Sequence, residues 1–178
     1  MPEESIPEEP TAQPAAAYRA LTPEDDGALA ALDLAVQRAE DPGFDALPER
    51  EREGRLSSSV AALKFYGRSG HSFAAVRTST LLGAVLAQSV WQGDKPIVLV
   101  RTVLIDPQLS PATTEDIRAG LLRALFKSAY DTAVYEVHFL TQPGASLPAE
   151  LGDIRHLGRY SVRYLGSRED TAQPSRPE

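Results

Sequence analysis

The sequence contains no cysteine, which excludes disulfide bonds, thiolate nucleophiles, iron–sulfur clusters and cysteine-ligated zinc sites. Histidine is also scarce, and the three histidines lie far apart in the chain, so no histidine-based metal site is expected. No apolar run approaches the roughly 18 residues that a membrane helix needs, and the first residues lack the basic and apolar regions of a secretory signal. These absences predict a cytoplasmic protein that uses no metal and does not enter a membrane.

The chain also lacks a basic stretch that could bind nucleic acid. The formal net charge is -7, but residues 1–14 alone carry four Glu and no base. Both ends, residues 1–14 and 167–178, are rich in Pro, Glu, Gln and Ser, so we expect disordered tails. Between them, residues 15–166 hold 16 bases and 18 acids. This nearly neutral part is long enough for one domain with a single core.

Two helices are predicted in the first third of the chain. Thr22-Pro23-Glu24-Asp25 is typical of a helix start, because Thr can cap a helix and Pro fits its first turn. Apolar residues then follow at helical spacing until Asp41-Pro42-Gly43 ends the helix. A second helix is expected from about residue 48 to residue 66. The residues expected on its buried side are Leu56, Val60, Leu63 and Phe65.

The remaining chain alternates strand and helix patterns. Strands are predicted at residues 17–21, 72–77, 81–91, 96–106, 133–140 and 160–165. Helices are predicted at residues 113–130 and 147–151. The strand at 96–106 is almost continuously apolar and should be central, with the strand at 133–140 parallel to it through a right-handed crossover. The fold class is therefore α/β (α+β), a single domain with one mixed sheet.

This order of elements, with the opening run YRALTPED and a central strand ending in Ile105-Asp106-Pro107, resembles the Gcn5-related N-acetyltransferase (GNAT) superfamily over residues 17–166. Within the superfamily the chain is similar to a small uncharacterised bacterial family. The excess of Arg over Lys is also typical of a GC-rich bacterium. The resemblance implies an N-acyltransferase that uses acetyl-CoA or another acyl-CoA and acylates an amine of a small molecule or a protein.

The resemblance also implies where the cofactor binds. In the superfamily the central strand and the strand after the crossover helix splay apart, and pantetheine bonds to the exposed backbone, here that of Val103, Leu104 and Ile105. The pyrophosphate is expected at the start of the following helix, where free N–H groups and the helix dipole attract an anion. The usual motif there is Arg/Gln-x-x-Gly-x-Gly/Ala. Its three positions fall on Thr113, Asp116 and Arg118 in this chain, so the motif is degenerate.

Residues at the start of this helix remain candidates for phosphate binding. They are Thr113, Thr114 and Arg118. The run Thr113-Thr114-Glu115-Asp116 is also typical of an ordinary helix cap made by a Thr side chain. Glu115 and Asp116 would then lie in the first turn, where the dipole favours carboxylates and where they would repel a pyrophosphate.

A second superfamily position departs from its pattern. Many members have a Tyr that protonates the departing CoA thiolate, and Ile154 occupies the corresponding position here. Isoleucine cannot donate a proton, so His156, Tyr160 or water would have to replace the Tyr.

Two polar residues interrupt the buried strand at 133–140. Glu136 and His138 are two residues apart and therefore share one face of the strand. Together they could remove a proton from an amine before it attacks a thioester. The alternative is a buried ion pair between Glu136 and Arg101 of the neighbouring strand, with His138 bonded to a backbone group.

Five aromatic residues at helix or strand spacing are expected in the core, namely Phe65, Tyr66, Trp91, Tyr130 and Tyr135. The alternative function is a catalytically silent binding or assembly module with the same fold, which could be a homodimer through an edge strand. Fold by itself does not decide between an enzyme and such a module.

Overall fold

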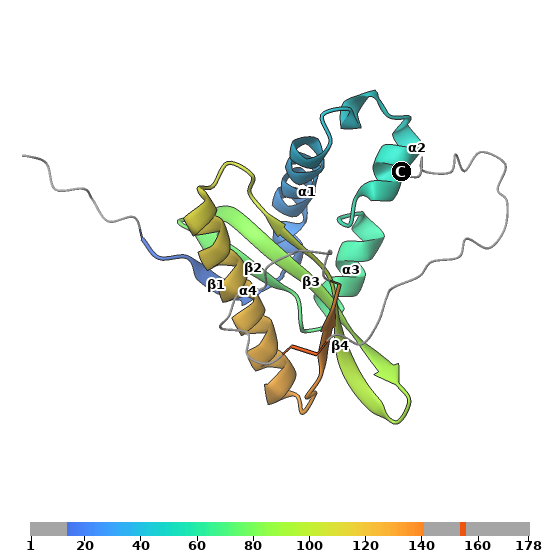
Figure 1. The fold of residues 1–178 in the computed structure, drawn as a ribbon, viewed down its shortest axis with the longest axis vertical. Coiled ribbons are helices and arrows are strands. Elements are labelled where there is room, and N and C mark those ends of the chain that lie inside the picture. Colours follow the sequence, from blue (N-terminus) through green and yellow to red (C-terminus); the bar gives the residue numbers. More distant parts are fainter. Residues whose placement is uncertain (1–13, 141–153, 156–178) are drawn as a thin grey trace, which may run out of the picture.

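The computed structural model describes residues 14–140 and 154–155. Among these residues, five strands form one sheet in the order β1-β2-β3-β4-β5 (Figure 1). The strands are β1 (Ala17–Ala20), β2 (Phe73–Arg77), β3 (Thr80–Gln92), β4 (Lys95–Ile105) and β5 (Val137–Phe139). The helices are α1 (Asp26–Glu40), α2 (Glu49–Arg55), α3 (Val60–Arg68) and α4 (Pro111–Asp131), with 3₁₀ turns η1 (Pro23–Asp25) and η2 (Phe44–Ala46).

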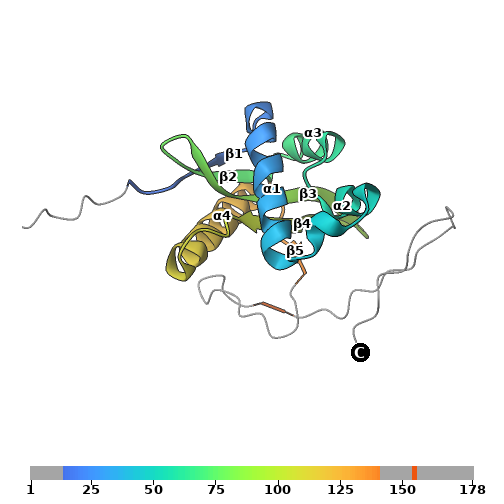
Figure 2. The same ribbon diagram turned by 90° about the horizontal axis from the view of Figure 1, so that it is seen from above.

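The helices cover both faces of the sheet (Figure 2). α4 packs on one face, where Ile117, Leu121 and Leu125 are buried against strand residues such as Val85 and Val98. α1 and α3 pack on the other face through leucines, against Ala84, Leu86 and Leu104. Neighbouring strands are antiparallel except for β4 and β5, which are parallel. The predicted α/β class with one mixed sheet is confirmed.

The single helix predicted for residues 48–66 is wrong, because the structure contains two helices there, α2 and α3. The chain leaves the helix at Leu56, and the backbone N–H groups of Ser57 and Ser58 donate to the buried carboxylate of Asp33 at 2.7 and 2.9 Å. Ser59 then caps α3 by accepting from Ala62 N. A carboxylate of α1 thus competes successfully with helix continuation, which local sequence patterns do not reveal.

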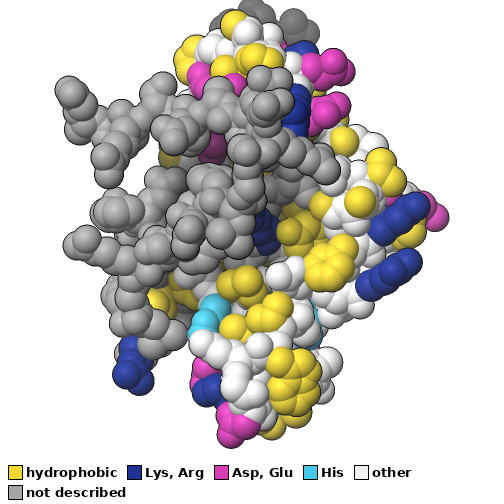
Figure 3. Space-filling model, turned by 90° about the vertical axis from the view of Figure 1, so that its right-hand side faces the viewer, with side chains coloured by type: hydrophobic (Ala, Val, Ile, Leu, Met, Phe, Trp, Pro, Cys, Tyr) yellow, Lys and Arg dark blue, Asp and Glu magenta, His cyan; other side chains and the backbone are white. Residues whose placement is uncertain are grey.

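Most of the aromatic residues expected in the core are exposed. Tyr66 is buried, but Trp91, Tyr130 and Tyr135 are 71–75 % exposed and Phe65 is 53 % exposed. Val60, expected on the buried side of its helix, is also exposed. The break at Leu56–Ser59 rotates α3 so that Leu63 and Tyr66 form its buried face. Exposed hydrophobic side chains lie between charged ones on the face shown in Figure 3.

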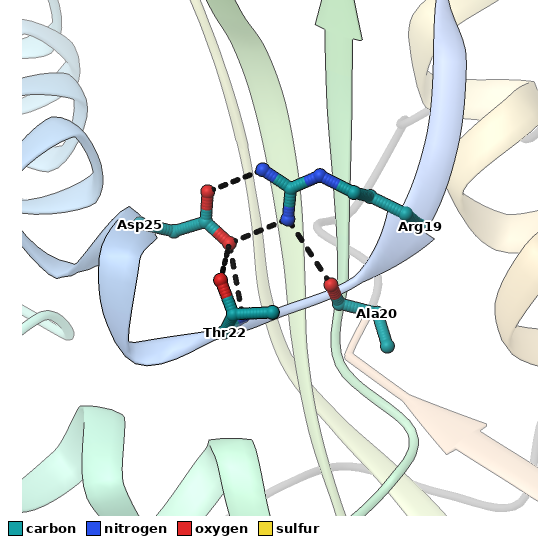
Figure 4. A network of polar contacts seen from close by, with 4 residues as sticks. All are labelled: Arg19, Ala20, Thr22 and Asp25. Carbon is teal, nitrogen blue, oxygen red and sulfur yellow. Dashed lines mark hydrogen bonds and ion pairs between the residues drawn. The ribbon is translucent and has the colours of Figure 1, made fainter.

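The predicted start of the first helix is confirmed at η1 and α1. Asp25 is buried and accepts two hydrogen bonds from the Arg19 guanidinium, both at 2.7 Å, and one from Thr22 N at 2.9 Å (Figure 4). The Arg19 side chain, followed by Thr22, holds the pKa of Asp25 below its ordinary value. The network joins edge strand β1 to the first helix.

We expect Asp25→Asn to lower the free energy of unfolding by about 1–2 kcal/mol at pH 7, because the charge-assisted bonds to Arg19 are lost. The pKa of Asp25 is lowered in the fold, so its contribution is present above the unfolded value of about 3.9 and is lost as pH falls through the folded value. Urea unfolding at neutral and acidic pH measures this difference. Asp26→Asn, at the adjacent position, is the control, and a deficit that does not shrink as the pH falls below about 3.9 would contradict the prediction.

Gly83 allows α4 to approach β3 closely. A Cβ at this position would lie 2.9 Å from Leu104 O and 3.1 Å from Ile117 Cγ2. The strand predicted to be central is β4, which in the described sheet lies next to the edge strand β5, while β3 is in the middle. Because one of the contacts of a Cβ at Gly83 is backbone of β4, we expect Gly83→Ala to destabilise the protein by about 1–3 kcal/mol. Gly54→Ala is the matched control, since a Cβ there would meet no atom within 4 Å and alanine favours a helix. Thermal melts of both variants test the difference.

Several predictions lie outside the described residues. They are the tails at 1–14 (save Pro14) and 167–178, the helix at 147–151 and the strand at 160–165. The strand predicted for 133–140 is shorter than expected, since β5 spans only Val137–Phe139. The preceding turn has Ala133 at φ 59°, a backbone conformation that no strand contains.

Candidate functional site

A β-bulge interrupts β4 near its middle. Leu86 of β3 lies opposite Thr102, and the next residue, Ala87, lies opposite Val100, so Arg101 is an extra residue with no partner in the register. Bulges bend a strand and end regular pairing, and they often occur beside active sites. Arg101 interrupts the apolar run of this strand and is exposed.

β4 and β5 part at the bulge. Their parallel pairing covers three positions, from Val98 opposite Val137 to Val100 opposite Phe139. β4 then continues to Ile105, whereas β5 ends at Phe139. Within residues 14–140, no strand pairs with the second half of β4 on that side. We call this side of residues 101–105 the β4–β5 gap.

Backbone alternation identifies which groups of β4 face the gap. Asp106 N donates to Leu82 O at 2.9 Å, so Asp106, Leu104 and Thr102 direct their backbone groups to β3. Val98 N donates to Glu136 O at 3.0 Å and faces β5 instead. Beyond the bulge, the backbone N–H and C=O of Val103 and Ile105 therefore face the gap. Of the three residues implied by the resemblance, Leu104 has its backbone paired with β3.

Glu136 and His138 lie next to each other beside the first half of β4, where His138 is opposite Leu99, just before the gap. Val137 and Phe139 pack into the core under α4, so the side chains of Glu136 and His138 point to the opposite face, which carries α1 and α3. His138 Nε2 lies 3.3 Å from Glu136 Oε2. Glu136 also forms an ion pair with Lys95 at the start of β4.

The predicted ion pair between Arg101 and Glu136 is therefore wrong, as is the expected bond from His138 to a backbone group. Lys95 takes the place of Arg101 because β5 runs parallel to β4 and meets its first half, while the bulge lies beyond the last paired residue. No local pattern in the sequence singles out Lys95, since it is 41 residues from Glu136 in the chain and the contact depends on the register between β4 and β5.

The charges around Glu136 determine which atom can accept a proton. Lys95, followed by His138, lowers the pKa of Glu136 below its ordinary value. Glu136 is then an ionised acceptor, so the hydrogen between the two side chains belongs to His138 Nε2. In the neutral imidazole this leaves Nδ1 as the nitrogen with a free lone pair. The pair can thus act as a general base. Glu136 fixes the orientation of the imidazole, and His138 Nδ1 is the atom that takes up the proton.

The start of α4 differs from the cap predicted for it. α4 begins at Pro111, and Ser110 is the N-cap, with its Oγ accepting from Thr113 N at 3.3 Å. Thr114 N donates to Ser110 O at 2.8 Å. The predicted cap at Thr113 and Thr114 is wrong, although Ser followed by Pro is a common sequence signal for a helix start.

The position of this cap moves the acidic pair. Glu115 and Asp116 lie in the second turn of α4, and the first turn contains no acidic residue. The expectation that they occupy the first turn is wrong, so their repulsion of an anion there is weaker than predicted. Arg118, the third candidate for phosphate binding, lies with Nε 3.6 Å from Glu115 Oε1.

Two candidate acids lie outside the described residues, namely His156 and Tyr160. Ile154, at the position of the superfamily Tyr, is half-buried. The part of the chain that the structure describes has no group of His, Asp and Glu residues placed to hold a metal ion. None of its helices combines the length and apolar character of a membrane span.

Known structures share this architecture. The Thermus thermophilus protein TTHA1254 is 33% identical and superposes with a TM-score of 0.59, covering 85% of this chain and 99% of its own. An aminoglycoside acetyltransferase from an uncultured soil metagenomic sample has a TM-score of 0.58 at 12% identity, covering 84% and 99% of the two chains. A Trypanosoma brucei acetyltransferase has the same TM-score at 16% identity, with the same coverage.

The fold is thus similar to that of acetyltransferases, as the resemblance in the order of elements implied. No curated protein matches the chain. One family model, described as protein of unknown function (DUF1999), matches residues 16–177. The chain therefore belongs to the DUF1999 family and has the fold of the GNAT acetyltransferases.

Proposed function

We propose that the protein is an acyl-CoA-dependent N-acyltransferase that transfers an acetyl or other acyl group to an amine. The observation that carries the proposal is the β4–β5 gap, where backbone groups of β4 have no partner among the described strands, with the Glu136–His138 pair beside the paired residues that precede it. The acetyltransferase structures with the same fold support it. Cytoplasmic location and a small-molecule or protein amine as acceptor are parts of the same proposal.

The gap fits the pantetheine part of an acyl-CoA. Pantetheine contains two amide groups, which can pair with backbone groups as a short strand does. Val103 and Ile105 offer N–H and C=O groups on the gap side, and no described strand satisfies them. Val103 and Ile105 would hold pantetheine, whereas Leu104 would make no backbone bond to it because its backbone groups are paired with β3. Acyl-CoA supplies the acyl group already activated as a thioester.

The phosphate end fits less well. Pro111 has no N–H group, and the N–H groups of Thr113 and Thr114 are bonded to Ser110. Fewer donors are therefore free for an anion than at a glycine-rich helix start. We propose that the pyrophosphate motif is degenerate and that Arg118, from the start of the third turn of α4, provides the main phosphate contact.

The chain's own residues would move one proton. His138 Nδ1 accepts it from the ammonium form of the acceptor, which thereby becomes a nucleophilic amine, and the resulting imidazolium is stabilised by Glu136 through Nε2–H. Lys95 keeps Glu136 ionised, so this hydrogen bond has a fixed direction. Protonation of the departing thiolate is assigned to His156, Tyr160 or water.

Titration calorimetry with acetyl-CoA and with S-acetylpantetheine tests the proposal on the full chain. We expect both ligands to bind and the shorter one to retain most of the affinity, because the gap holds pantetheine and the phosphate loop is poor. Arg118→Gln should weaken acetyl-CoA without affecting S-acetylpantetheine. Absence of heat for both ligands at millimolar concentration would reject the enzyme and leave the catalytically silent module, including a homodimer.

A further inference from the structure

A hollow on the α1 and α3 side of the sheet has no role in the proposed acyl transfer. Its volume is about 430 Å³, within the range of small-molecule sites. It lies between η1, the first turns of α1 and the second half of α3. Its lining includes no residue of β4, β5 or α4, so it is separate from the β4–β5 gap.

The lining combines an apolar surface with two cations. The apolar side chains are Leu21, Pro23, Leu29 and Leu63. Lys64 and Arg68 also line the hollow from consecutive turns of α3. Residues four apart share a helix face, where two like charges destabilise the helix slightly. Neither cation has an ion-pair partner within residues 14–140.

One carboxylate, that of Asp26, lies in the same lining. It belongs to the first turn of α1, where the helix dipole stabilises a negative charge. The lining therefore carries one positive charge in excess. A ligand that complements it has an apolar body and one anionic group.

The hollow is also kept open by a glycine. Gly67 lies on α3 between the two cations, and a Cβ there would meet no atom within 4 Å. Packing therefore does not require glycine, which in a helix costs about 0.5–1 kcal/mol relative to alanine. A side chain at this position would project into open space beside Lys64 and Arg68.

We propose that this hollow binds a small amphipathic carboxylate, whose apolar body contacts Leu21 and Pro23 and whose carboxylate pairs with Lys64 and Arg68. Burial of the apolar body contributes most of the affinity. The two cations select against neutral and cationic molecules of the same size, since charge complementarity acts mainly on specificity. The site is a second one, independent of acyl-CoA.

Octanoate is the probe, titrated into the full chain by calorimetry and followed by NMR. We expect saturable binding, with octylammonium much weaker. The double variant K64Q/R68Q should lower the octanoate affinity by about tenfold. Arg50→Gln, which removes an exposed cation from α2, should leave it unchanged. Gly67→Leu should also weaken binding, because its side chain reduces the open space.

Three results would overturn the proposal. The first is equal affinity for octanoate and octylammonium, and the second is wild-type affinity in K64Q/R68Q. The third is displacement of octanoate by acetyl-CoA, which would place the fatty acid in the β4–β5 gap. Circular dichroism of each variant establishes that it is folded, as expected for exposed substitutions. Failure of acetyl-CoA binding leaves this test intact, because the octanoate titration needs no acyl-CoA.

Discussion

Replacing His138 with glutamine is expected to lower kcat for acyl transfer by about 10²–10⁴-fold, the usual contribution of a general base. Glutamine retains a polar group of similar reach but cannot accept the proton at Nδ1. The chain has no cysteine, so CoA thiol release from acetyl-CoA can be read with a thiol reagent without background.

Two neighbouring variants separate proton transfer from general disturbance of the site. Glu136→Gln keeps an acceptor for His138 Nε2 but removes the charge that stabilises the imidazolium, so an intermediate loss of kcat is expected. Lys95→Gln removes only the ion pair at the exposed side of Glu136 and should have the smallest effect. Equal kcat in wild type and His138→Gln would remove His138 from the mechanism.

Asp33→Ala is expected to lower the free energy of unfolding by about 3 kcal/mol, a large effect for a single side chain. Asp33 is completely buried, and one of its oxygens accepts from both Ser57 N and Ser58 N. Alanine leaves both N–H groups without their charged acceptor. The carboxylate also lies near the start of α3, where a negative charge is favourable. Urea denaturation of both proteins measures the difference.

Asparagine at the same position is the matched control. Asp33→Asn retains an oxygen that can accept from the two backbone groups and has nearly the same volume, so it should lose less than half as much stability. The other Asp33 oxygen has no hydrogen-bond partner among the described residues, so the asparagine amide group replaces an atom without a partner. A loss below about 1 kcal/mol in Asp33→Ala would show that Ser57 and Ser58 find other acceptors.

Local patterns predicted the elements better than their ends. The long helix α4 and the buried strands β3 and β4 were correctly expected, because their hydrophobic periodicity extends over many residues. The errors occurred where one residue from elsewhere in the chain decides the backbone. Asp33 divides the predicted helix at 48–66, and the shorter β5 follows a turn with Ala133 at positive φ.

The candidate site was predictable only in part. Strand alternation correctly placed Glu136 and His138 on one face, and the resemblance indicated the second half of the central strand. Ser110 could have been recognised from the following proline, whereas Lys95 could not, because no short-range pattern relates it to Glu136. His156 and Tyr160 remain predictions.

The sequence by itself determined the α/β class, the absence of thiol chemistry and the shared face of Glu136 and His138, since composition and periodicity are local properties. Tertiary structure alone decided that Arg101 forms a bulge, that Lys95 pairs with Glu136 and that Val103 and Ile105 face the β4–β5 gap. These features depend on the register between strands. Register is a relation between distant segments that share a core, and it becomes fixed when a face of the sheet is buried against that core.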